Sequence, residues 1–303
     1  MRLQILHRTC YRYGSAVRDN FNEVRLMPYS DLGQRCESFL LAVDPQASTF
    51  AYTDIYGNIF HQFQVFTPHA VLEVCSTSRV ETPGQPLLYP GAPSVPLGTR
   101  AAYPAPDGYF DFLGPSTFVS LDPEVRSEAR GAAGTQRDAW QAAQALMHHV
   151  HRSLAYLPES THVHTHMREV LASRRGVCQD FAHVLLGLLR SLDLSARYVS
   201  GYLYNGPRET LKGAQASHAW VEVFLPGIGW AGLDPTNDQV VVGRHIKVAH
   251  GRDYADVPPV KGTYRGTGDR KLTVEVRVES LEAQGDVPPQ GFPAGTAHSK
   301  ATS

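Results

Sequence analysis

Three residues in the second half of the sequence have types that together could perform nucleophilic catalysis. Cys178 stands at the start of an apolar helical pattern, His218 lies in a strand-like run, and Asp234 ends the next such run. A thiol whose pKa is near ~8.5 is mostly protonated at neutral pH. The positive end of a helix and a neighbouring imidazole would both favour the thiolate. We therefore expect Cys178 as nucleophile, His218 as general base and acid, and Asp234 as the residue that orients the imidazole.

The elements that must position these residues follow from local patterns. Apolar residues recur at three- and four-residue spacing over 181–192, which predicts a core-facing helix that starts at Cys178. The runs 196–204 and 217–225 are typical of strands. A Pro-Gly-Ile-Gly turn then leads into a third strand at 230–234.

Strand parity decides whether His218 and Asp234 can meet. Alternate residues of a strand share one face, so His218 lies on the face of Trp220, and Asp234 lies on that of Trp230. If the two strands pair residues whose numbers sum to an even value near ~452, His218 and Asp234 are neighbours on the same face. An odd sum would place them on opposite faces and exclude the triad.

Four segments resemble the motifs of the bacterial transglutaminase-like superfamily. They contain the cysteine, the histidine, the aspartate and a downstream signature, in Arg175–His183, Ala216–Glu222, Gly229–Asn237 and Gly251–Pro259. The β-rich beginning of the chain is also similar to the sandwich that precedes the core in these bacterial proteins. The resemblance therefore extends from Met1 to about Gly266, with its motifs in the family's order.

This resemblance implies an α+β fold, in which an N-terminal antiparallel β-sandwich precedes a papain-like, transglutaminase-like core. The nucleophile helix would pack on an antiparallel sheet. The implied activity is that of a cysteine peptidase or acyltransferase, which attacks amide bonds of peptides or proteins through a thioester on Cys178. Water as acceptor would give a peptidase or amidase, and an amine would give a transglutaminase. The resemblance leaves this choice, and the physiological substrate, open.

Such chemistry needs donors for the oxyanion that forms on the substrate carbonyl. The backbone N–H of Cys178 is one natural donor, because it lies at a helix start. We assign the second to the hydroxyl of Tyr156, which lies upstream of the cysteine. Trp220 follows His218 by two residues, so it either packs in the core or forms a wall of the substrate cleft.

The remainder of the chain is predicted to form a second domain, a connection and a tail. Residues 1–82 show alternating and short apolar runs separated by turn signals, which indicate a small antiparallel β domain. Residues 83–118 are rich in proline and glycine and predict an extended connection. The catalytic core is expected over 119–283, including a last strand near its end. Residues 284–303 are expected to be a mobile tail.

Composition argues against several other classes of protein. Lys and Arg total 28 and Asp and Glu total 29, so no basic surface for nucleic acid or an anionic membrane is indicated. No apolar run approaches the ~18 residues of a transmembrane helix, and the first residues lack the pattern of a secretory signal. We expect a cytoplasmic protein with reduced cysteines. The thiols of Cys10, Cys36 and Cys75 are interpreted as small buried hydrophobes.

Two rival functions remain open at the level of sequence. The clusters His148/His149/His151 and His162/His164/His166 could bind Zn²⁺ or Fe²⁺ in a metal-dependent hydrolase. Against this, the chain has no His-Glu-x-x-His motif and few acidic residues near the clusters. The other rival is a catalytically silent binding module on the same fold. The preferred interpretation requires neither a metal nor another cofactor, and the oligomeric state is left undetermined.

Overall fold

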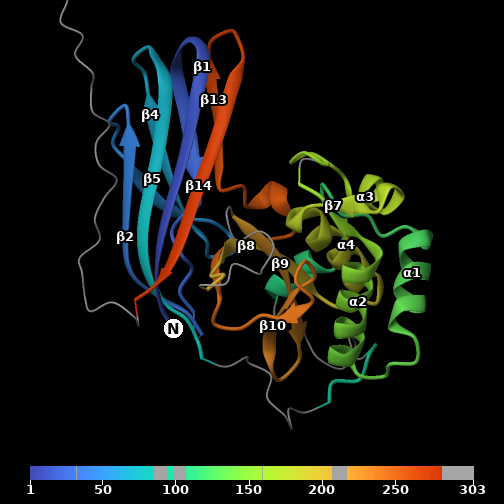
Figure 1. The fold of residues 1–303 in the computed structure, drawn as a ribbon. Coiled ribbons are helices and arrows are strands. Elements are labelled where there is room, and N and C mark those ends of the chain that lie inside the picture. The colour runs from blue at the N-terminus through green and yellow to red at the C-terminus, as the bar shows by residue number, and fades with distance from the viewer. Residues whose placement is uncertain (32, 85–93, 99–106, 159, 207–216, 282–303) are drawn as a thin grey trace, which may run out of the picture.

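The computed structural model describes residues 1–31, 33–84, 94–98, 107–158, 160–206 and 217–281 (Figure 1). A seven-stranded sheet contains β1 (Arg2–Val24), β2 (Arg35–Asp44), β3 (Phe50–Thr53), β4 (Ile59–Val65), β5 (His69–Glu81), β13 (Val260–Arg265) and β14 (Arg270–Ser280). A five-stranded sheet contains β8 (Ala196–Leu203), β9 (His218–Leu225), β10 (Gly229–Asp234), β11 (Gln239–Val240) and β12 (His245–Gly251). The helices are α1 (Pro123–Ala133), α2 (Ala139–Ser153), α3 (Met167–Ser173) and α4 (Cys178–Ser191). A small parallel sheet joins β6 (Ala155–Tyr156) to β7 (Arg175–Gly176), and 3₁₀ segments span Asp107–Phe112 and Tyr254–Asp256.

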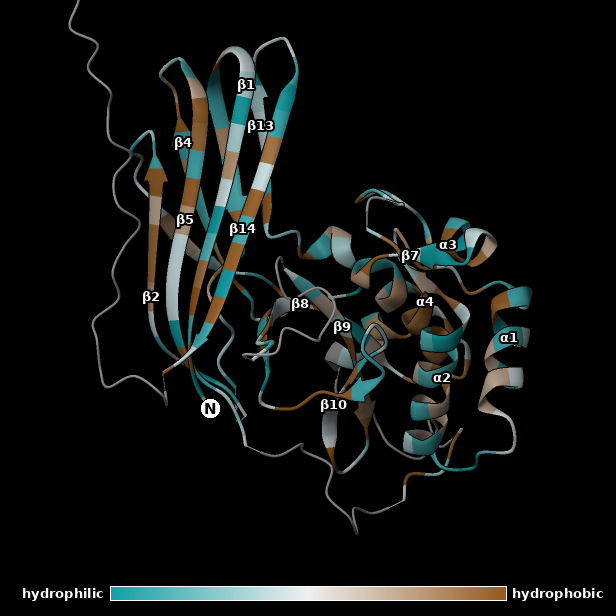
Figure 2. Cartoon of the chain, in the orientation of Figure 1, coloured by the Kyte–Doolittle hydropathy of each residue, from teal (hydrophilic) through white to brown (hydrophobic). Residues whose placement is uncertain are grey.

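The N-terminal sheet curls into a sandwich because both of its layers share β1. The first half of β1 pairs with β5 and β14, and its last residues pair with β4 and β13. The register shifts twice between Arg12 and Phe21, and Asp19 lies there with a φ of 49°. Such bulges bend a strand and increase its twist. The layers enclose an apolar core that includes Phe63 and Leu72, and Figure 2 shows hydrophilic and hydrophobic bands alternating along β5 and β14.

The five-stranded sheet lies between the N-terminal sheet and the helices, with strand order β11-β10-β9-β8-β12 (Figure 1). Helix α4 packs on β8 and β9 and is surrounded by α1, α2 and α3. Every residue of α4 after Cys178 is buried, as the predicted apolar pattern requires. On β9, Ala219, Val221 and Val223 share this core and alternate with His218 and Trp220, which lie on the other face. The α+β class, the sandwich and the nucleophile helix on an antiparallel sheet are confirmed.

The C-terminal strands belong to a different sheet from the one that the sequence suggested. Residues 119–283 were expected to form the core, whereas β13 and β14 both pair with β1 of the N-terminal sheet. Strand periodicity places alternate side chains on two faces but does not select the partner strand. Parts of the expected connection 83–118 and the whole tail 284–303 lie outside the described residues. Among the helices that the structure describes, none has the length and apolarity needed to cross a membrane.

Two side-chain amides join the N-terminal sandwich to the outer edge of β12. The amide of Gln34 accepts the Lys247 N–H at 2.9 Å and donates to the Lys247 carbonyl at 2.8 Å. The amide of Asn58 makes the same pair of bonds with His250, at 2.9 and 2.8 Å. An edge strand presents unpaired backbone groups, which cost free energy when they are buried. These amides satisfy that edge and fix β12 relative to the rest of the core sheet.

Candidate active site

Cys178 is the first residue of α4, where a helix start has unpaired N–H groups. The Asp180 carboxylate accepts the Val177 N–H at 2.8 Å and the Thr161 hydroxyl at 2.6 Å. Gly176 permits this arrangement, because a Cβ there would lie 2.6 Å from the Asp180 side chain. Burial raises the pKa of Asp180, and the hydrogen bonds from Thr161 and Val177 oppose that rise. Asp180 therefore caps the nucleophile helix and fixes the turn that presents Cys178.

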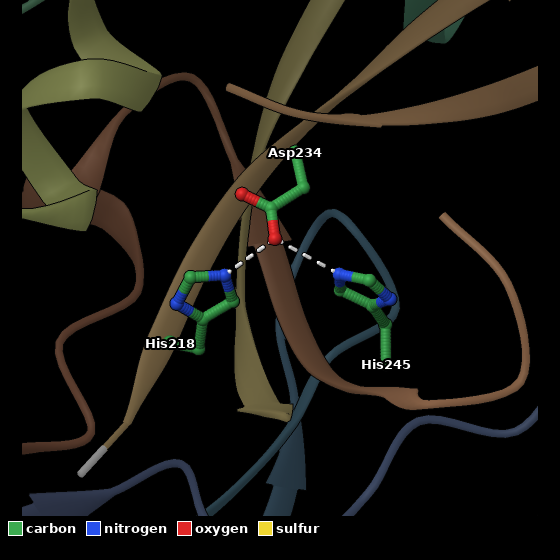
Figure 3. A group of neighbouring side chains, drawn as sticks. All are labelled: His218, Asp234 and His245. Atoms are coloured by element: carbon green, nitrogen blue, oxygen red, sulfur yellow. Dashed lines mark hydrogen bonds and ion pairs between the residues drawn. The ribbon is translucent and has the colours of Figure 1, made fainter. Parts of the chain in front are cut away.

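His218 and Asp234 are brought together at neighbouring ends of β9 and β10. Ala231 pairs with Val223 and Leu233 with Val221, so the residue numbers of each pair have an even sum. The parity condition is met, and the His218 Nε2–H donates to Asp234 Oδ2 at 2.9 Å (Figure 3). Both side chains are completely buried. The hydrogen bond fixes the ring orientation and leaves Nδ1 as the nitrogen available for proton transfer.

The Asp234 carboxylate is held by several donors. Oδ1 accepts the backbone N–H groups of Thr236 and Asn237 at 3.0 and 3.2 Å. Oδ2 accepts the Asn237 amide at 2.9 Å, in addition to His218 and His245. Burial alone would raise the pKa of Asp234, but the charges and hydrogen bonds of the two histidines hold it well below its usual range. Asp234 is therefore an ionised acceptor throughout the neutral pH range.

The imidazole of His218 is stabilised in its charged form. Burial by itself would lower its pKa, but the charge and hydrogen bond of Asp234, followed by the influence of Cys178, raise the pKa to about 10. Its Nδ1 is buried and has no partner of ordinary hydrogen-bond geometry among the described residues. In Figure 3 this second nitrogen points away from Asp234. The contribution of Cys178 to this raised pKa indicates that its thiol lies near the ring.

The two weaker sequence candidates, Tyr156 and Trp220, lie near different members of the predicted triad. Tyr156 pairs with Gly176 across β6 and β7, so it lies beside the turn that carries Cys178. Burial, with a smaller contribution from Cys178, raises the pKa of Tyr156 to about 12, which keeps the hydroxyl protonated as a donor. Trp220 is buried and lies one step along the same face as His218, with ring centroids 6.2 Å apart. The tip of its ring packs on Gly201, where a Cβ would lie 2.6 Å away.

His245 is part of this arrangement, although the sequence did not single it out. Its Nε2 lies 3.1 Å from Asp234 Oδ2, and its ring packs against Trp220 at a centroid separation of 5.2 Å. It comes from β12, which is separated from β10 by two strands. The only local signal was its position at the start of an apolar run, and many core histidines share that position. Its role could therefore not be inferred from spacing.

The rival histidine clusters do not converge on a metal site. The first three bind three different partners: His148 with Asp238, His149 with Glu128 and His151 with the carbonyl of Pro235. His162 lies 3.3 Å from the Thr165 hydroxyl, and the His166 side chain caps the start of α3. Among the described residues, the ligand-type atoms that lie within 4.8 Å of one another belong to His218, Asp234 and His245. The hydrogen bonds described above account for that grouping.

The other thiols lie in the N-terminal sandwich and lack a comparable environment. Burial and the neighbouring Glu73 raise the pKa of Cys75 to about 12, and burial also raises the pKa of Cys36. Cys10 is buried on β1, and all four cysteines are free thiols. A raised pKa reduces the thiolate fraction, so Cys36 and Cys75 are poor nucleophiles at neutral pH.

Comparison with known proteins assigns the chain to a family. The Transglutaminase-like superfamily matches residues 126–235, and the Bacterial transglutaminase-like N-terminal region matches residues 3–81. An uncharacterised protein of Mycobacterium tuberculosis is 37% identical over 299 residues, which cover 94% of each chain. Another from Mycobacterium leprae is 34% identical, over 92% of this chain and 99% of the relative. The chain therefore belongs to the transglutaminase-like superfamily and carries its bacterial N-terminal region.

Two further proteins indicate the fold and the range of chemistry. A crystal structure of a candidate cysteine protease from Cytophaga hutchinsonii has a TM-score of 0.75 and 22% identity, and the match covers 97% of this chain and 94% of that one. It shows that the fold is shared. A protein-glutamine gamma-glutamyltransferase of Pseudomonas aeruginosa is 29% identical over 48% of this chain and 26% of its own. The family supports thiol-dependent acyl chemistry in general.

Proposed function

We propose that the protein transfers acyl groups from peptide or protein amides through a thioester on Cys178, with His218 and Asp234 completing the triad. The observation that carries this proposal is the state of His218. Its Nε2 is fixed on a buried carboxylate, its Nδ1 has no hydrogen-bond partner in the part of the chain that the structure describes, and Cys178 acts on the same ring. A nucleophile, a base and a residue that orients the base are the parts that such catalysis requires.

The raised pKa of His218 places the thiol proton on its Nδ1 at neutral pH, and in the first half-reaction the thiolate sulfur attacks the amide carbonyl carbon. Charge develops on the carbonyl oxygen, and the backbone N–H of Cys178 and the Tyr156 hydroxyl are the proposed donors to it. The imidazolium then gives its proton to the leaving nitrogen as the C–N bond breaks. An amine departs and a thioester remains on Cys178.

In the second half-reaction an acceptor attacks the thioester while Nδ1 of His218 takes its proton. The C–S bond breaks, and the departing thiolate again pairs with the imidazolium. Water as acceptor completes hydrolysis, and an amine completes amide transfer. Hydrolysis and amide transfer use the same residues, and both are acyl transfer from peptide or protein amides.

Mass spectrometry of Cys178 after exposure to a peptide-amide library, with and without an added amine, tests this proposal. We expect an acyl adduct on Cys178 that the amine releases as a new amide. Cys178→Ala should lose the adduct and keep its melting temperature. Cys75→Ala is the matched control and should behave as the wild type, because that thiol is in the sandwich. An unchanged adduct in Cys178→Ala would identify another nucleophile, and no adduct in the wild type would favour a silent binding module.

A further inference from the structure

We propose that His245 is a positioning residue for this chemistry, whose Nε2–H holds Oδ2 of Asp234 and thereby fixes the carboxylate that orients His218. The inference rests on the proposed function and adds a fourth side chain to it. His245 comes from β12, so it would couple the catalytic pair to a strand that the N-terminal sandwich holds in place through Gln34 and Asn58.

The geometry requires a proton on Nε2 of both histidines. Nε2 of His218 and Nε2 of His245 lie 2.9 and 3.1 Å from the same oxygen of Asp234, on two sides of it (Figure 3). An ionised carboxylate can only accept hydrogen bonds, so each ring must donate. All three side chains are fully buried, and hydrogen bonds to a charged group are stronger than neutral ones. His245 therefore restrains Oδ2 more tightly than His218 and the Asn237 amide, which donates to the same oxygen at 2.9 Å, could without it.

A purely structural role explains the other nitrogen of His245 poorly. Its Nδ1 is buried and lacks a hydrogen-bond partner among the described residues. Burying an unpaired polar atom costs free energy, which an apolar ring of the same shape would avoid. The contact with Trp220 would also be available to phenylalanine. The feature that only the histidine supplies at this position is the N–H directed at Asp234.

His245 also borders a cavity of about 410 Å³ between the sandwich and the core sheet. Trp220 lines the same cavity, as do the charged side chains Asp31, Arg197, Glu222 and Lys247. Lys247 pairs with Glu222 at 3.2 Å and with Asp31 at 2.7 Å, and Arg197 also pairs with Glu222, so two cations and two anions balance along this lining. A small molecule such as imidazole could therefore reach the space left by a truncated His245 side chain.

Two substitutions separate positioning from packing. His245→Phe keeps a ring against Trp220 and loses the N–H, whereas His245→Gln loses the ring and keeps an N–H donor. The readout is the rate at which iodoacetamide alkylates Cys178, followed by mass spectrometry from pH 5 to pH 10. We expect His245→Phe to lower the rate at pH 7 by about 10- to 100-fold, the range for loss of a buried hydrogen bond to a charged group. At alkaline pH, where a thiol ionises unaided, its rate should approach that of the wild type.

His245→Gln should recover most of the rate at pH 7, and millimolar imidazole should partly restore His245→Ala. The matched control is His250→Ala, because His250 is equally buried on β12 and packs on Tyr29 rather than on Asp234. It should keep the wild-type pH profile. Full neutral-pH reactivity in His245→Phe, or an equal loss in His250→Ala, would overturn the role of His245. Failure of the proposed function is distinguishable, because His218→Ala would then leave the wild-type rate of Cys178 unchanged.

Discussion

The two sheets of this protein bury their side chains to different extents. In the core sheet, all eight residues of β8 and all seven of β12 are buried, because helices cover one face and the sandwich covers the other. In the N-terminal sheet, β2 alternates between exposed and half-buried positions, and all of β3 is exposed. Ionisable groups on β8 and β12 of the core sheet therefore interact in a dry environment, whereas those on β2 of the N-terminal sheet are screened by water.

This difference in burial explains why the core sheet can hold charged catalytic side chains in strong contact with one another. Arg197, Glu222 and Lys247 form a buried ion network there, and the nearby cations lower the pKa of Glu222 to about 2 against the opposing effect of burial. The His218–Asp234 pair is still less accessible. Ion pairs of the sandwich such as Arg35–Glu81 are exposed, and pairs of that kind contribute little to stability. Four experiments test this comparison, from the largest expected effect to the smallest.

The largest effect should come from Asp234→Asn, compared with Asp238→Asn in the partly exposed pair with His148. Replacing the buried carboxylate removes the charge that stabilises the His218 imidazolium and permits the wrong tautomer. We expect peptide-amide turnover to fall by about 10⁴-fold for Asp234→Asn, as for the orienting aspartate of other triads. Asp238→Asn should change turnover by less than about twofold, because that pair is partly hydrated. Equal losses in steady-state assays would remove the distinction between the two pairs.

The next effect is on stability, through Glu222→Gln compared with Glu37→Gln. The first substitution leaves Arg197 and Lys247 buried without their shared carboxylate. Breaking a buried ion network from one side costs roughly 3–5 kcal/mol of unfolding free energy. Glu37 pairs with the exposed Arg2, and its loss should cost at most about 1 kcal/mol. Denaturant titrations measure both losses of unfolding free energy. Similar losses would show that a buried ion pair contributes no more to stability than an exposed one.

A smaller effect is expected where the sandwich meets the edge of β12. Gln34→Ala leaves the Lys247 N–H without its partner, at roughly 1–3 kcal/mol for a buried group left unpaired, whereas the Lys247 carbonyl still accepts the Tyr29 N–H at 2.9 Å. Gln62→Ala is the control, since that amide only contacts the Glu23 carboxylate on the sandwich. Its unfolding free energy should change by less than about 1 kcal/mol. Hydrogen exchange of β12 should also increase in Gln34→Ala and stay unchanged in the control.

The smallest effect is a pH dependence that arises from His183, which is buried in α4. Burial, with smaller contributions from the charges of Arg190 and His166, lowers its pKa to about 3. A depressed pKa means that the unfolded chain binds the proton more readily, so stability is retained above the ordinary pKa near ~6.5 and is lost as pH falls below it, until about 3. At pH 5 the loss should reach about 2 kcal/mol.

His183→Gln removes this titration while keeping an acceptor for the Tyr254 N–H. Its unfolding free energy should therefore fall less steeply than that of the wild type between pH 7 and pH 5. Denaturant titrations at several pH values would measure the difference. Parallel curves for the two proteins would mean that His183 is already protonated, or is hydrated, in the folded state.

Local patterns predicted the elements around the site with small errors at their ends. The helix expected from Cys178 is α4, and the strands expected at 217–225 and 230–234 are β9 and β10. The even pairing followed from the short turn between them, because in a hairpin the register depends on a few neighbouring residues. The positions of Tyr156 beside Gly176 and of Asp180 under the helix start depended on contacts across separate segments, so the sequence could only suggest them.

The sequence by itself determined the residue types, the helix that begins with the cysteine, and the neighbours with which His218 and Asp234 each share a face of their own strand. Those properties depend on periodicity and on neighbours along the chain. Only the tertiary structure placed His245 beside Asp234 and paired β13 and β14 with β1. The choice of partner strand depends on the surface that distant segments bury together, and no single segment contains that information.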